Sequence, residues 1–162
     1  MRVVVLGPGG SGKSTFAQRL ATVTGIPSIE LDKRFWGPQL EPTSRHRWIE
    51  IQARLVQGEA WIMDGDLGPD DVIDVRLSAA DTVVLLDLPT WVCAWRALRR
   101  SRARADFWRW LVSWRRRYRP QLMHAIKERA GGAELIIVSN QRDLDRVIDE
   151  LARRPERRDE GR

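Results

Sequence analysis

The sequence predicts an α/β domain with a parallel β-sheet covered by helices on both faces. Short runs of valine, leucine and isoleucine alternate along the chain with longer segments of helical periodicity. Each short run is continuously apolar, as expected for strands buried on both faces. Segments rich in glycine, proline and polar residues separate the two kinds of element. We therefore predict five strands in a single three-layer domain, without an internal repeat.

The strands are predicted from their composition. Residues 82–86 form the clearest run, Thr-Val-Val-Leu-Leu, because β-branched and aliphatic residues favour strands. Several of these runs lead directly into an aspartate, which places acidic side chains at the ends of strands. The five predicted strands are 3–6, 28–31, 60–63, 82–86 and 134–138.

The helices are predicted from apolar spacing and from their terminal residues. The segment 13–24 has helical spacing and stops at Gly25-Ile26-Pro27. A loop is expected over 33–42, after which Thr43 or Ser44 can cap the next helix, to about Val56. Further helices are expected near 72–77, from 90 through the arginine-rich stretch, from 106 to about 118, from Pro120 to about 130 if that proline starts a new helix, and over 143–153.

The composition limits the class of protein. The chain has 162 residues, the size of one domain, which we place at 1–154 with a charged, disordered tail at 155–162. One cysteine, Cys93, excludes a disulfide scaffold and a multi-cysteine zinc site. The presence of only two histidines, His46 and His124, argues against a histidine-rich metal centre. No apolar run approaches the roughly 20 residues of a membrane helix, so we expect a soluble cytoplasmic protein.

The positive charge is concentrated in one segment. Residues 96–119 contain ten arginines and one acid and carry a charge of +9, whereas the rest of the chain carries −3 of the total of +6. Such a segment attracts polyanions, including nucleotide phosphates and nucleic acid. A solvated helix face is the alternative, since arginine is a good helix former.

A glycine loop follows the first predicted strand and precedes the first predicted helix. It matches the phosphate-binding pattern G-x-x-x-x-G-K-[ST] at every fixed position. Glycines let the backbone turn its N–H groups toward phosphate oxygens, and the helix N-terminus adds a positive dipole. Lys13 would reach the β- and γ-phosphates, and the Ser14 hydroxyl would bind Mg²⁺. The residues expected to bind the nucleotide are Gly7, Pro8, Gly9, Gly10, Ser11, Gly12, Lys13, Ser14 and Thr15.

The loop indicates a P-loop NTPase fold, and further motifs favour a kinase over a GTPase. A GTPase should carry D-x-x-G after its third strand, and the chain has no D-x-x-G. The stretch Asn140–Asp143 lacks the lysine of the guanine-reading motif N-K-x-D, and we interpret it as a loop with a helix cap at Asp143. We expect a phosphotransferase or a nucleoside triphosphate hydrolase, with an arginine-rich lid that neutralises the transferring group.

These motifs together resemble one family. Besides the glycine loop they are LDKRFW at 31–36, WIMDG at 61–65, DVRL at 74–77, ADTV at 80–83, LDLP at 86–89, WVC at 91–93 and YRP at 118–120. The set is similar to the bacterial "DNA topology modulation protein" group, which resembles the adenylate kinase and shikimate kinase branch of P-loop proteins. The resemblance implies strand order 2-3-1-4-5, ATP with Mg²⁺ as phosphoryl donor, and an unidentified acceptor.

The sequence departs from that group at two places. The arginine-rich helix passes directly into the tryptophan-containing helix at 104–107, where relatives carry an insertion, so the lid at about 96–119 is short. Asp66 and Leu67 replace the Asn-Tyr pair that usually follows Asp-Gly, which changes the expected acceptor pocket.

Strand-end acids are the other candidate site residues. Ligands bind beyond the carboxyl ends of the strands in such sheets. By the resemblance, Asp32 would orient or deprotonate an acceptor hydroxyl; a loop-capping aspartate is the alternative. Asp64 would hold Mg²⁺ through its water shell, or simply form a turn with Gly65. We interpret Asp87 as a structural cap.

Arginine and tryptophan side chains complete the candidates. Arg76 either reads an acceptor phosphate or is a surface helix arginine. Arg99, Arg100 and Arg104 are the lid candidates: we expect at least one of them to touch phosphate, and solvent exposure is the alternative for each one singly. Trp36 is the aromatic residue that we assign to the acceptor pocket. The paired spacing Trp91/Trp95 and Trp110/Trp114 favours buried packing over base stacking, and Trp108 is a further candidate for stacking. The remaining candidates for contact with phosphate or nucleic acid are Arg115, Arg116, Arg117 and Arg119.

Two functions follow from these observations. The first is an ATP-dependent small-molecule kinase with a nucleotide-like or hydroxylated acceptor. The second is a nucleotide-dependent nucleic-acid-binding or regulatory protein that uses the +9 segment and its tryptophans. We expect no membrane partner, and the oligomeric state stays open.

Overall fold

A five-stranded parallel sheet organises the computed structural model, which describes residues 1–37, 41–67, 71–100 and 105–154. The strand order is β2-β3-β1-β4-β5, as the family resemblance implied. Central β1 pairs with both neighbours, so that Val5 lies opposite Asp64 of β3 and Val84 of β4. The strands are β1 (Arg2–Leu6), β2 (Ser28–Glu30), β3 (Trp61–Asp64), β4 (Thr82–Leu86) and β5 (Glu134–Val138).

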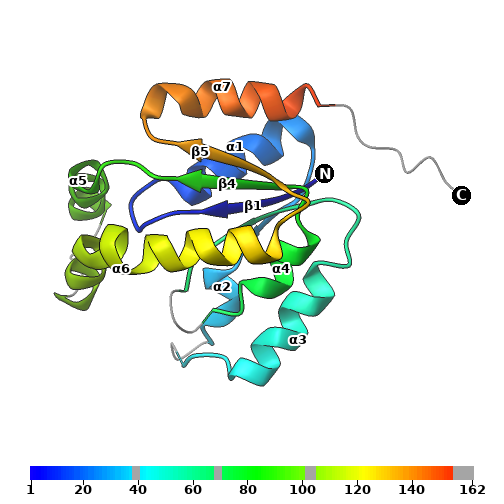
Figure 1. Cartoon of the computed structure of the whole chain (residues 1–162), viewed down its shortest axis with the longest axis horizontal. Helices are drawn as coiled ribbons and strands as arrows, with labels where there is room; N and C mark the ends of the chain where they lie inside the picture. The colour runs from blue at the N-terminus through cyan, green and yellow to red at the C-terminus, as the bar shows by residue number, and fades with distance from the viewer. Residues whose placement is uncertain (38–40, 68–70, 101–104, 155–162) are drawn as a thin grey trace, which may run out of the picture.

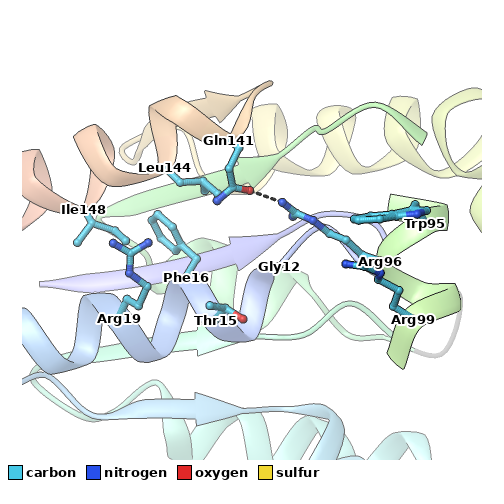
Figure 2. Close-up of a pocket in the computed structure, with 11 residues that line it drawn as sticks. Gly12, Thr15, Phe16, Arg19, Trp95, Arg96, Arg99, Gln141, Leu144 and Ile148 are labelled. Carbon is cyan, nitrogen blue, oxygen red and sulfur yellow. Dashed lines mark hydrogen bonds between the residues drawn. The ribbon is translucent and has the colours of Figure 1, made fainter. Parts of the chain in front are cut away.

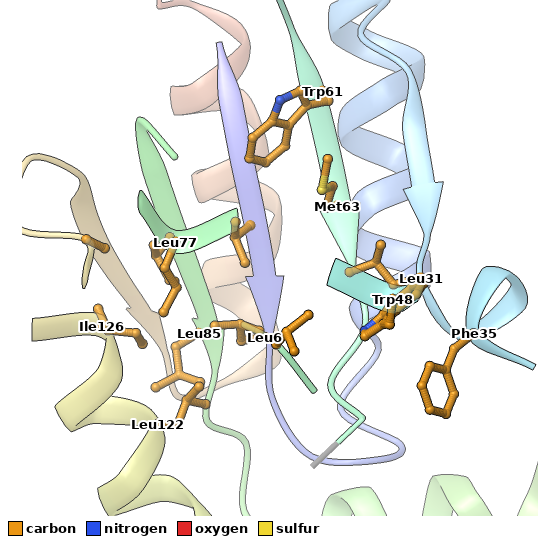
Figure 3. Packing of buried hydrophobic residues seen from close by; sticks show 14 of the residues in the cluster. Leu6, Leu31, Phe35, Trp48, Trp61, Met63, Leu77, Leu85, Leu122 and Ile126 are labelled. Atoms are coloured by element: carbon orange, nitrogen blue, oxygen red, sulfur yellow. The ribbon is translucent and has the colours of Figure 1, made fainter. Parts of the chain in front are cut away.

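Helices cover both faces of this sheet, as Figure 1 shows. One face packs against α1 (Lys13–Thr24) and α7 (Gln141–Ala152), through residues such as Phe16, Leu20 and Ile148. The other face carries the larger core, where Trp48, Trp61 and Leu77 are buried (Figure 3). That core is closed by α3 (Arg45–Leu55), α4 (Asp74–Ala79) and α6 (Ala105–Arg129), with α2 (Asp32–Phe35) at its end; α5 (Thr90–Arg100) packs against α6.

Three predicted element boundaries were wrong. The expected loop over 33–42 begins with the short helix α2, because Phe35 is anchored in the core against Trp48 with ring centroids 5.3 Å apart. Pro120 neither interrupts nor starts a helix: α6 runs through it. The last helix begins at Gln141, two residues early, because the Asn140 side chain and not Asp143 is its cap, accepting from the Asp143 amide.

Other boundaries agree closely with the prediction. Ser44 caps α3 by accepting from the Arg47 amide, and Gly25 ends α1 in a left-handed conformation. Within the described residues, no helix is both long and apolar enough to cross a membrane. The expected tail at 155–162 lies outside the residues that the structure describes.

The parallel arrangement brings the ends of the strands to one edge of the sheet. The glycine loop leaves β1 there, Asp64 ends β3, and Asp87 follows β4. In Figure 1 the arrowheads of β1 and β4 point to the side where α5 and the first turns of α6 lie. This edge therefore gathers the chemistry-bearing residues of the chain.

Candidate active site

The glycine loop is pressed against two neighbouring elements. Gly7, Gly10 and Gly12 have φ angles of 143°, 79° and 97°, in the range that favours glycine. A Cβ at Gly7 would lie 2.5 Å from the Leu86 carbonyl oxygen, and one at Gly10 would lie 2.4 Å from that of Cys93. The loop is thus seated between the end of β4 and the first turns of α5, with no room for a side chain at Gly7 or Gly10.

The lysine of the loop closes it from inside. Lys13 Nζ donates to the carbonyl oxygens of Gly7 at 2.9 Å and Pro8 at 3.3 Å. These bonds hold an ammonium group at the mouth of the loop. Its positive charge reaches two carboxyl groups, since it lowers the pKa of both Asp32 and Asp64 against the effect of burial. Lysine, loop and both predicted acids therefore share one site.

Asp64 is buried, with 2% of its surface exposed. Burial raises its pKa, while a hydrogen bond from Ser14 and the charge of Lys13 act in the opposite direction. Its Oδ1 atom has no hydrogen-bond partner among the described residues. A buried carboxylate oxygen without a partner is costly unless a ligand completes it.

This donor set fits Mg²⁺. Magnesium prefers oxygen ligands and usually keeps several waters, with one or two protein oxygens and the substrate phosphates completing its shell. The Ser14 hydroxyl and the orphaned Oδ1 of Asp64 belong to side chains already joined by a hydrogen bond. The described residues contain no group of three or more acids, histidines or cysteines that could hold a metal ion. Within this part of the chain, a Mg²⁺ ion would therefore need ligands from water and the substrate as well.

Asp32 stands at the rim of the site, as the first residue of α2. Its side chain reaches solvent, yet the surrounding atoms desolvate it enough to raise its pKa, and Asp64, Asp66 and Asp71 add to that rise against Lys13. Gly65 makes the close approach possible: a Cβ there would lie 2.9 Å from Leu31 Cβ and 3.4 Å from Asp32 Oδ1. The Asp-Gly pair is therefore more than a turn, because it seats Asp32 beside Asp64.

Asp87 holds two arginines of α6 and is not the cap that we expected. Arg115 Nη2 donates to its Oδ1 and to its backbone carbonyl, both at 3.1 Å, and Arg119 Nε donates to its Oδ2 at 2.8 Å. The two guanidinium groups stay partly exposed, at 46% and 34%. The sequence correctly predicted that Asp87 lies at the carboxyl end of its strand, but it did not predict the ion pairs with α6.

The lid arginine that contacts the glycine loop is not one of the three that we expected. Arg96, which we had not singled out, donates to the Ser11 carbonyl oxygen at 3.3 Å and to the Gln141 side chain. Arg99 lies over the ring of Trp95, 3.9 Å from its centroid. Arg104 and the side chain of Arg100 lie outside the described residues. Arg96 lies one helical turn after Cys93, whose backbone packs against the loop at Gly10, and this spacing could have identified it.

A pocket of about 330 Å³ adjoins the glycine loop (Figure 2). Apolar side chains from α1 and α7 form one wall, and cationic and aromatic side chains from α5 form the other. Thr15 lines it near the start of α1, whereas the Asn140 cap residue does not. The lining residues are Gly10, Gly12, Thr15, Phe16, Arg19, Trp95, Arg96, Arg99, Gln141, Leu144 and Ile148.

Comparison with solved structures identifies the architecture. Shikimate kinase from Acinetobacter baumannii superimposes with a TM-score of 0.66 at 18% identity, covering 93% of this chain and 89% of that one. Deoxyadenosine kinase from M. mycoides gives 0.55 at 12% identity, covering 93% and 96%. A gluconokinase from Sinorhizobium meliloti gives 0.53 at 17% identity, covering 93% and 89%.

The chain has the P-loop kinase fold.

Sequence comparison agrees with this fold. Adenylate kinase of Mycobacterium leprae is 41% identical over 88 residues, and that of Mycobacterium tuberculosis is 37% identical over 86. The matches cover 51% and 50% of this chain but only 43% and 42% of those enzymes, so less than half of each relative is spanned. No family model matches the sequence.

Arg76 has neither of the two roles that we weighed in this P-loop kinase fold. Its side chain is completely buried, so it is not a surface arginine, and it presents no surface to an acceptor. Its two Nη atoms bind both oxygens of Asp71 at 2.8 and 2.6 Å, Gln52 at 3.0 Å and the Gly65 carbonyl at 3.1 Å. Arg76 thus supports the loop that carries Gly65.

The tryptophans divide between core and surface. Trp114 is buried as expected, but Trp91 and Trp95 are 75% and 55% exposed, so the prediction that their pair is buried was wrong. Trp36 is 44% exposed, packed edge-on against Phe35. A broad hollow of about 1150 Å³ lies along α6, lined by Thr90, Trp108, Arg109, Trp110, Val112, Ser113, Arg115, Arg116, Arg117 and Tyr118.

Proposed function

We propose that this chain is an ATP- and Mg²⁺-dependent kinase that transfers the γ-phosphoryl group to a small-molecule acceptor. The observation that carries the proposal is the placement of Lys13, Asp32 and Asp64 at one edge of the sheet, with Asp32 packed against the Gly65 backbone that follows Asp64. The P-loop kinase fold and the partial match to adenylate kinases support it. The resemblance to DNA topology modulation proteins belongs to the proposal too and does not specify an acceptor.

The glycine loop would hold the triphosphate. The loop's backbone N–H groups and the N-terminus of α1 would favour anions, and Lys13 would exchange its loop carbonyl partners for the β- and γ-phosphate oxygens. Ser14 and Asp64 would hold Mg²⁺, which when bound neutralises charge on those oxygens. The pocket beside Trp95 and Arg96 would take the nucleoside, because it continues directly from the loop and offers an aromatic and an apolar wall.

Asp32 would act on the acceptor. A carboxylate with a raised pKa at the rim can orient a hydroxyl and accept its proton. Arg99, Arg100 and Arg104 remain proposed phosphate contacts of the lid, and Trp36 remains a proposed wall of the acceptor site. Arg115 and Arg119, held by Asp87, add cationic groups at the same edge.

The test is acceptor-dependent ADP formation from Mg-ATP. The panel holds nucleosides, nucleoside monophosphates, hydroxylated metabolites and short DNA and RNA. We expect one acceptor class to raise turnover, Lys13→Ala to abolish it, and Lys127→Ala, an exposed lysine on α6, to leave it unchanged. Turnover that ignores every acceptor and survives Lys13→Ala would contradict the proposal.

A second candidate function rests on the hollow along α6. Its arginines and tryptophans, with exposed Trp91 and Trp95 on α5, offer stacking faces beside positive charge. A nucleotide-dependent nucleic-acid-binding protein would bind DNA or RNA with a steep salt dependence that ATP alters. Absence of binding at low salt removes this candidate.

A further inference from the structure

The hollow along α6 opens beside the proposed kinase site. It is lined by Thr90, the first residue of α5, and by side chains of the first half of α6, from Trp108 to Tyr118. In Figure 1 these parts of α5 and α6 lie on the side of the sheet to which β1 and β4 point. Its volume of about 1150 Å³ exceeds the roughly 300–1,000 Å³ that is usual for pockets of drug-sized ligands. The hollow therefore has room for part of a larger molecule.

Arg115 connects the hollow to the glycine loop. It lines the hollow, and its Nη2 atom donates to the Asp87 side chain and to the Asp87 carbonyl oxygen, both at 3.1 Å. Asp87 follows Leu86, whose carbonyl oxygen would lie 2.5 Å from a Cβ at Gly7. One end of a ligand in the hollow would therefore reach the edge of the sheet where the loop is proposed to hold the triphosphate.

Tyr118 connects the hollow to the acceptor side of the site. It lines the hollow and also a smaller space that Asp66 and Asp71 line. The charges of these two aspartates act on Asp32, the residue that we propose takes the acceptor proton. A chain-like ligand can therefore lie along α6 and place one end beside Asp32.

The charge of the hollow favours a polyanion. Four of the described arginines line it, namely Arg109, Arg115, Arg116 and Arg117, and the last two are exposed. All four belong to the segment 96–119, and its charge of +9 counts every residue in it. The negative charges of a polyanion repeat along its length, so several of these arginines can each meet one of them.

Aromatic side chains make nucleic acid the polyanion that fits. Tyr118 and two tryptophans line the hollow, and Trp91, the residue after Thr90, is 75% exposed. The bases of a single strand can stack on such rings whatever their sequence, while a positively charged groove follows the backbone. In a duplex the bases are already stacked on one another. The hollow therefore favours a single strand.

We propose that the site also phosphorylates the 5′-hydroxyl end of a single-stranded nucleic acid that lies in the hollow along α6, a further activity that rests on the proposed kinase function. The 5′-hydroxyl is a primary alcohol on a CH₂ group that projects beyond the last sugar ring. It can therefore reach the site while the backbone phosphates stay beside the arginines.

The reaction balances without a further reactant. The 5′-hydroxyl oxygen forms a bond to the γ-phosphorus. The bond between that phosphorus and the β–γ bridging oxygen breaks, and its electron pair leaves with ADP. The hydroxyl proton passes to the Asp32 carboxylate and then to solvent, so the products are a 5′-phosphorylated strand and ADP.

The experiment gives the full chain ATP labelled at the γ-phosphate, with an oligothymidylate of about ten nucleotides, a length within the usual site sizes of such grooves. The strand with a free 5′-hydroxyl is compared with the same strand bearing a 5′-phosphate, with thymidine and with the panel of small acceptors. We expect label at the 5′ end of the first strand and none in the second. The kcat/KM of the first strand should exceed that of thymidine by about tenfold or more, because thymidine does not fill the hollow.

Arg116→Gln combined with Arg117→Gln tests the hollow itself. This double variant should raise the KM for the strand about tenfold at low salt, and it should reduce the slope of log KM against log salt by about 0.7 for each arginine that meets a phosphate. The KM values for thymidine and ATP should not change. Arg45→Gln combined with Arg54→Gln removes the same charge from the exposed surface of α3 and should change none of these values. Trp91→Ala should raise the KM for the strand about fivefold or more.

The outcomes distinguish this activity from the proposed function. The inference is overturned, and the kinase stands, if a small molecule takes the label and the strand does not. The same conclusion follows if the strand is no better than thymidine, if the Arg116/Arg117 double variant leaves its KM unchanged, or if the 5′-phosphorylated strand takes the label at another hydroxyl. If no organic acceptor takes the label, the proposed function and the inference both fail, and salt-dependent binding of the strand would then support the second candidate function.

Discussion

At the residue scale, Gly10 and Gly25 have nearly the same backbone conformation but different surroundings. Comparing their alanine variants distinguishes the cost of a left-handed backbone from the cost of a close contact. Gly10 has φ 79° and Gly25 has φ 73°. A Cβ at Gly10 would meet the Cys93 carbonyl oxygen at 2.4 Å, whereas at Gly25 nothing lies within 4 Å. Gly25→Ala should cost about 1–2 kcal/mol of stability from the left-handed conformation alone.

Gly10→Ala should cost more than Gly25→Ala and should also weaken nucleotide binding, because the loop must move away from α5 to admit the methyl group. Urea denaturation and titration with an ATP analogue check both variants. Equal stability losses, with nucleotide affinity retained in Gly10→Ala, would show that the contact with Cys93 does not position the loop.

The raised pKa of Asp32 gives a prediction with a definite sign. Burial raises it first, and the neighbouring aspartates add to the rise against Lys13. As the proposed base, Asp32 must be ionised, so kcat/KM should fall as pH decreases through a value above the ordinary 3.8. Asp32→Asn should remove this acid limb and lower kcat by about 10²–10⁴-fold. An unchanged pH–rate profile in the variant would contradict the assignment.

The same shift affects stability without nucleotide. The native state binds the Asp32 proton more tightly than the unfolded state does, so the free energy of unfolding should fall as pH rises from 3.8 through the raised pKa. Asp32→Asn should remove that loss. Chemical denaturation at a series of pH values measures it, and a larger loss in the variant than in the native chain would run against the expected sign.

At the scale of elements, one buried ion pair joins α4 to the segment after β3. Burial alone would raise the pKa of Asp71, but the charge and hydrogen bonds of Arg76 outweigh it and hold that pKa below its usual value. Asp71→Asn would leave the guanidinium buried without its counter-charge, which should cost about 3–5 kcal/mol.

The matched control is Asp74→Asn. Asp74 pairs with Arg129 across 3.5 Å, and both side chains are more than half exposed. That exposed pair should contribute less than about 1 kcal/mol. Urea denaturation compares the two variants. Similar losses in the free energy of unfolding would mean that burial does not make the Asp71–Arg76 pair more stabilising than the exposed pair.

The elements differ in how far the sequence predicted them. The central strands β1, β3 and β4 followed from apolar runs, and the glycine loop followed from a spacing that phosphate binding requires. The helix α2 was missed because four residues carry no periodicity and its stability comes from Phe35 packing on Trp48. Arg76 was misjudged because its partners Asp71 and Gln52 lie on other elements, and burial of a charge depends on tertiary packing.

At the scale of the whole molecule, parallel strands explain why part of the site was predictable. Lys13 and Asp32 come after β1 and β2, and Asp64 ends β3. These strands are neighbours in the sheet, so strand direction alone brings the three residues to one edge. The positions of the arginines were harder to predict, because the rotation of α5 and α6 relative to the sheet decides which arginines face the loop. Thus Arg96 and the Asp87 pairs emerged only from the structure.

The arginines of the +9 segment that the structure describes therefore lie on several surfaces and not on one. Arg96 contacts the loop, Arg115 and Arg119 are held by Asp87, and Arg116 and Arg117 face solvent along the α6 hollow. This division agrees with the kinase reading, in which part of the charge serves the nucleotide site. It also leaves enough exposed charge to make nucleic-acid binding worth measuring.

The most direct test of the central claim follows the γ-phosphate itself. ATP labelled at that group is mixed with excess protein, Mg²⁺ and the acceptor panel for a single turnover, and the products are separated. The account predicts label in an organic acceptor, lost in Lys13→Ala and retained in Lys127→Ala. Label found only in inorganic phosphate, at the same rate with and without acceptors, would contradict it, because the edge of the sheet would then be a hydrolytic site and not one of phosphoryl transfer.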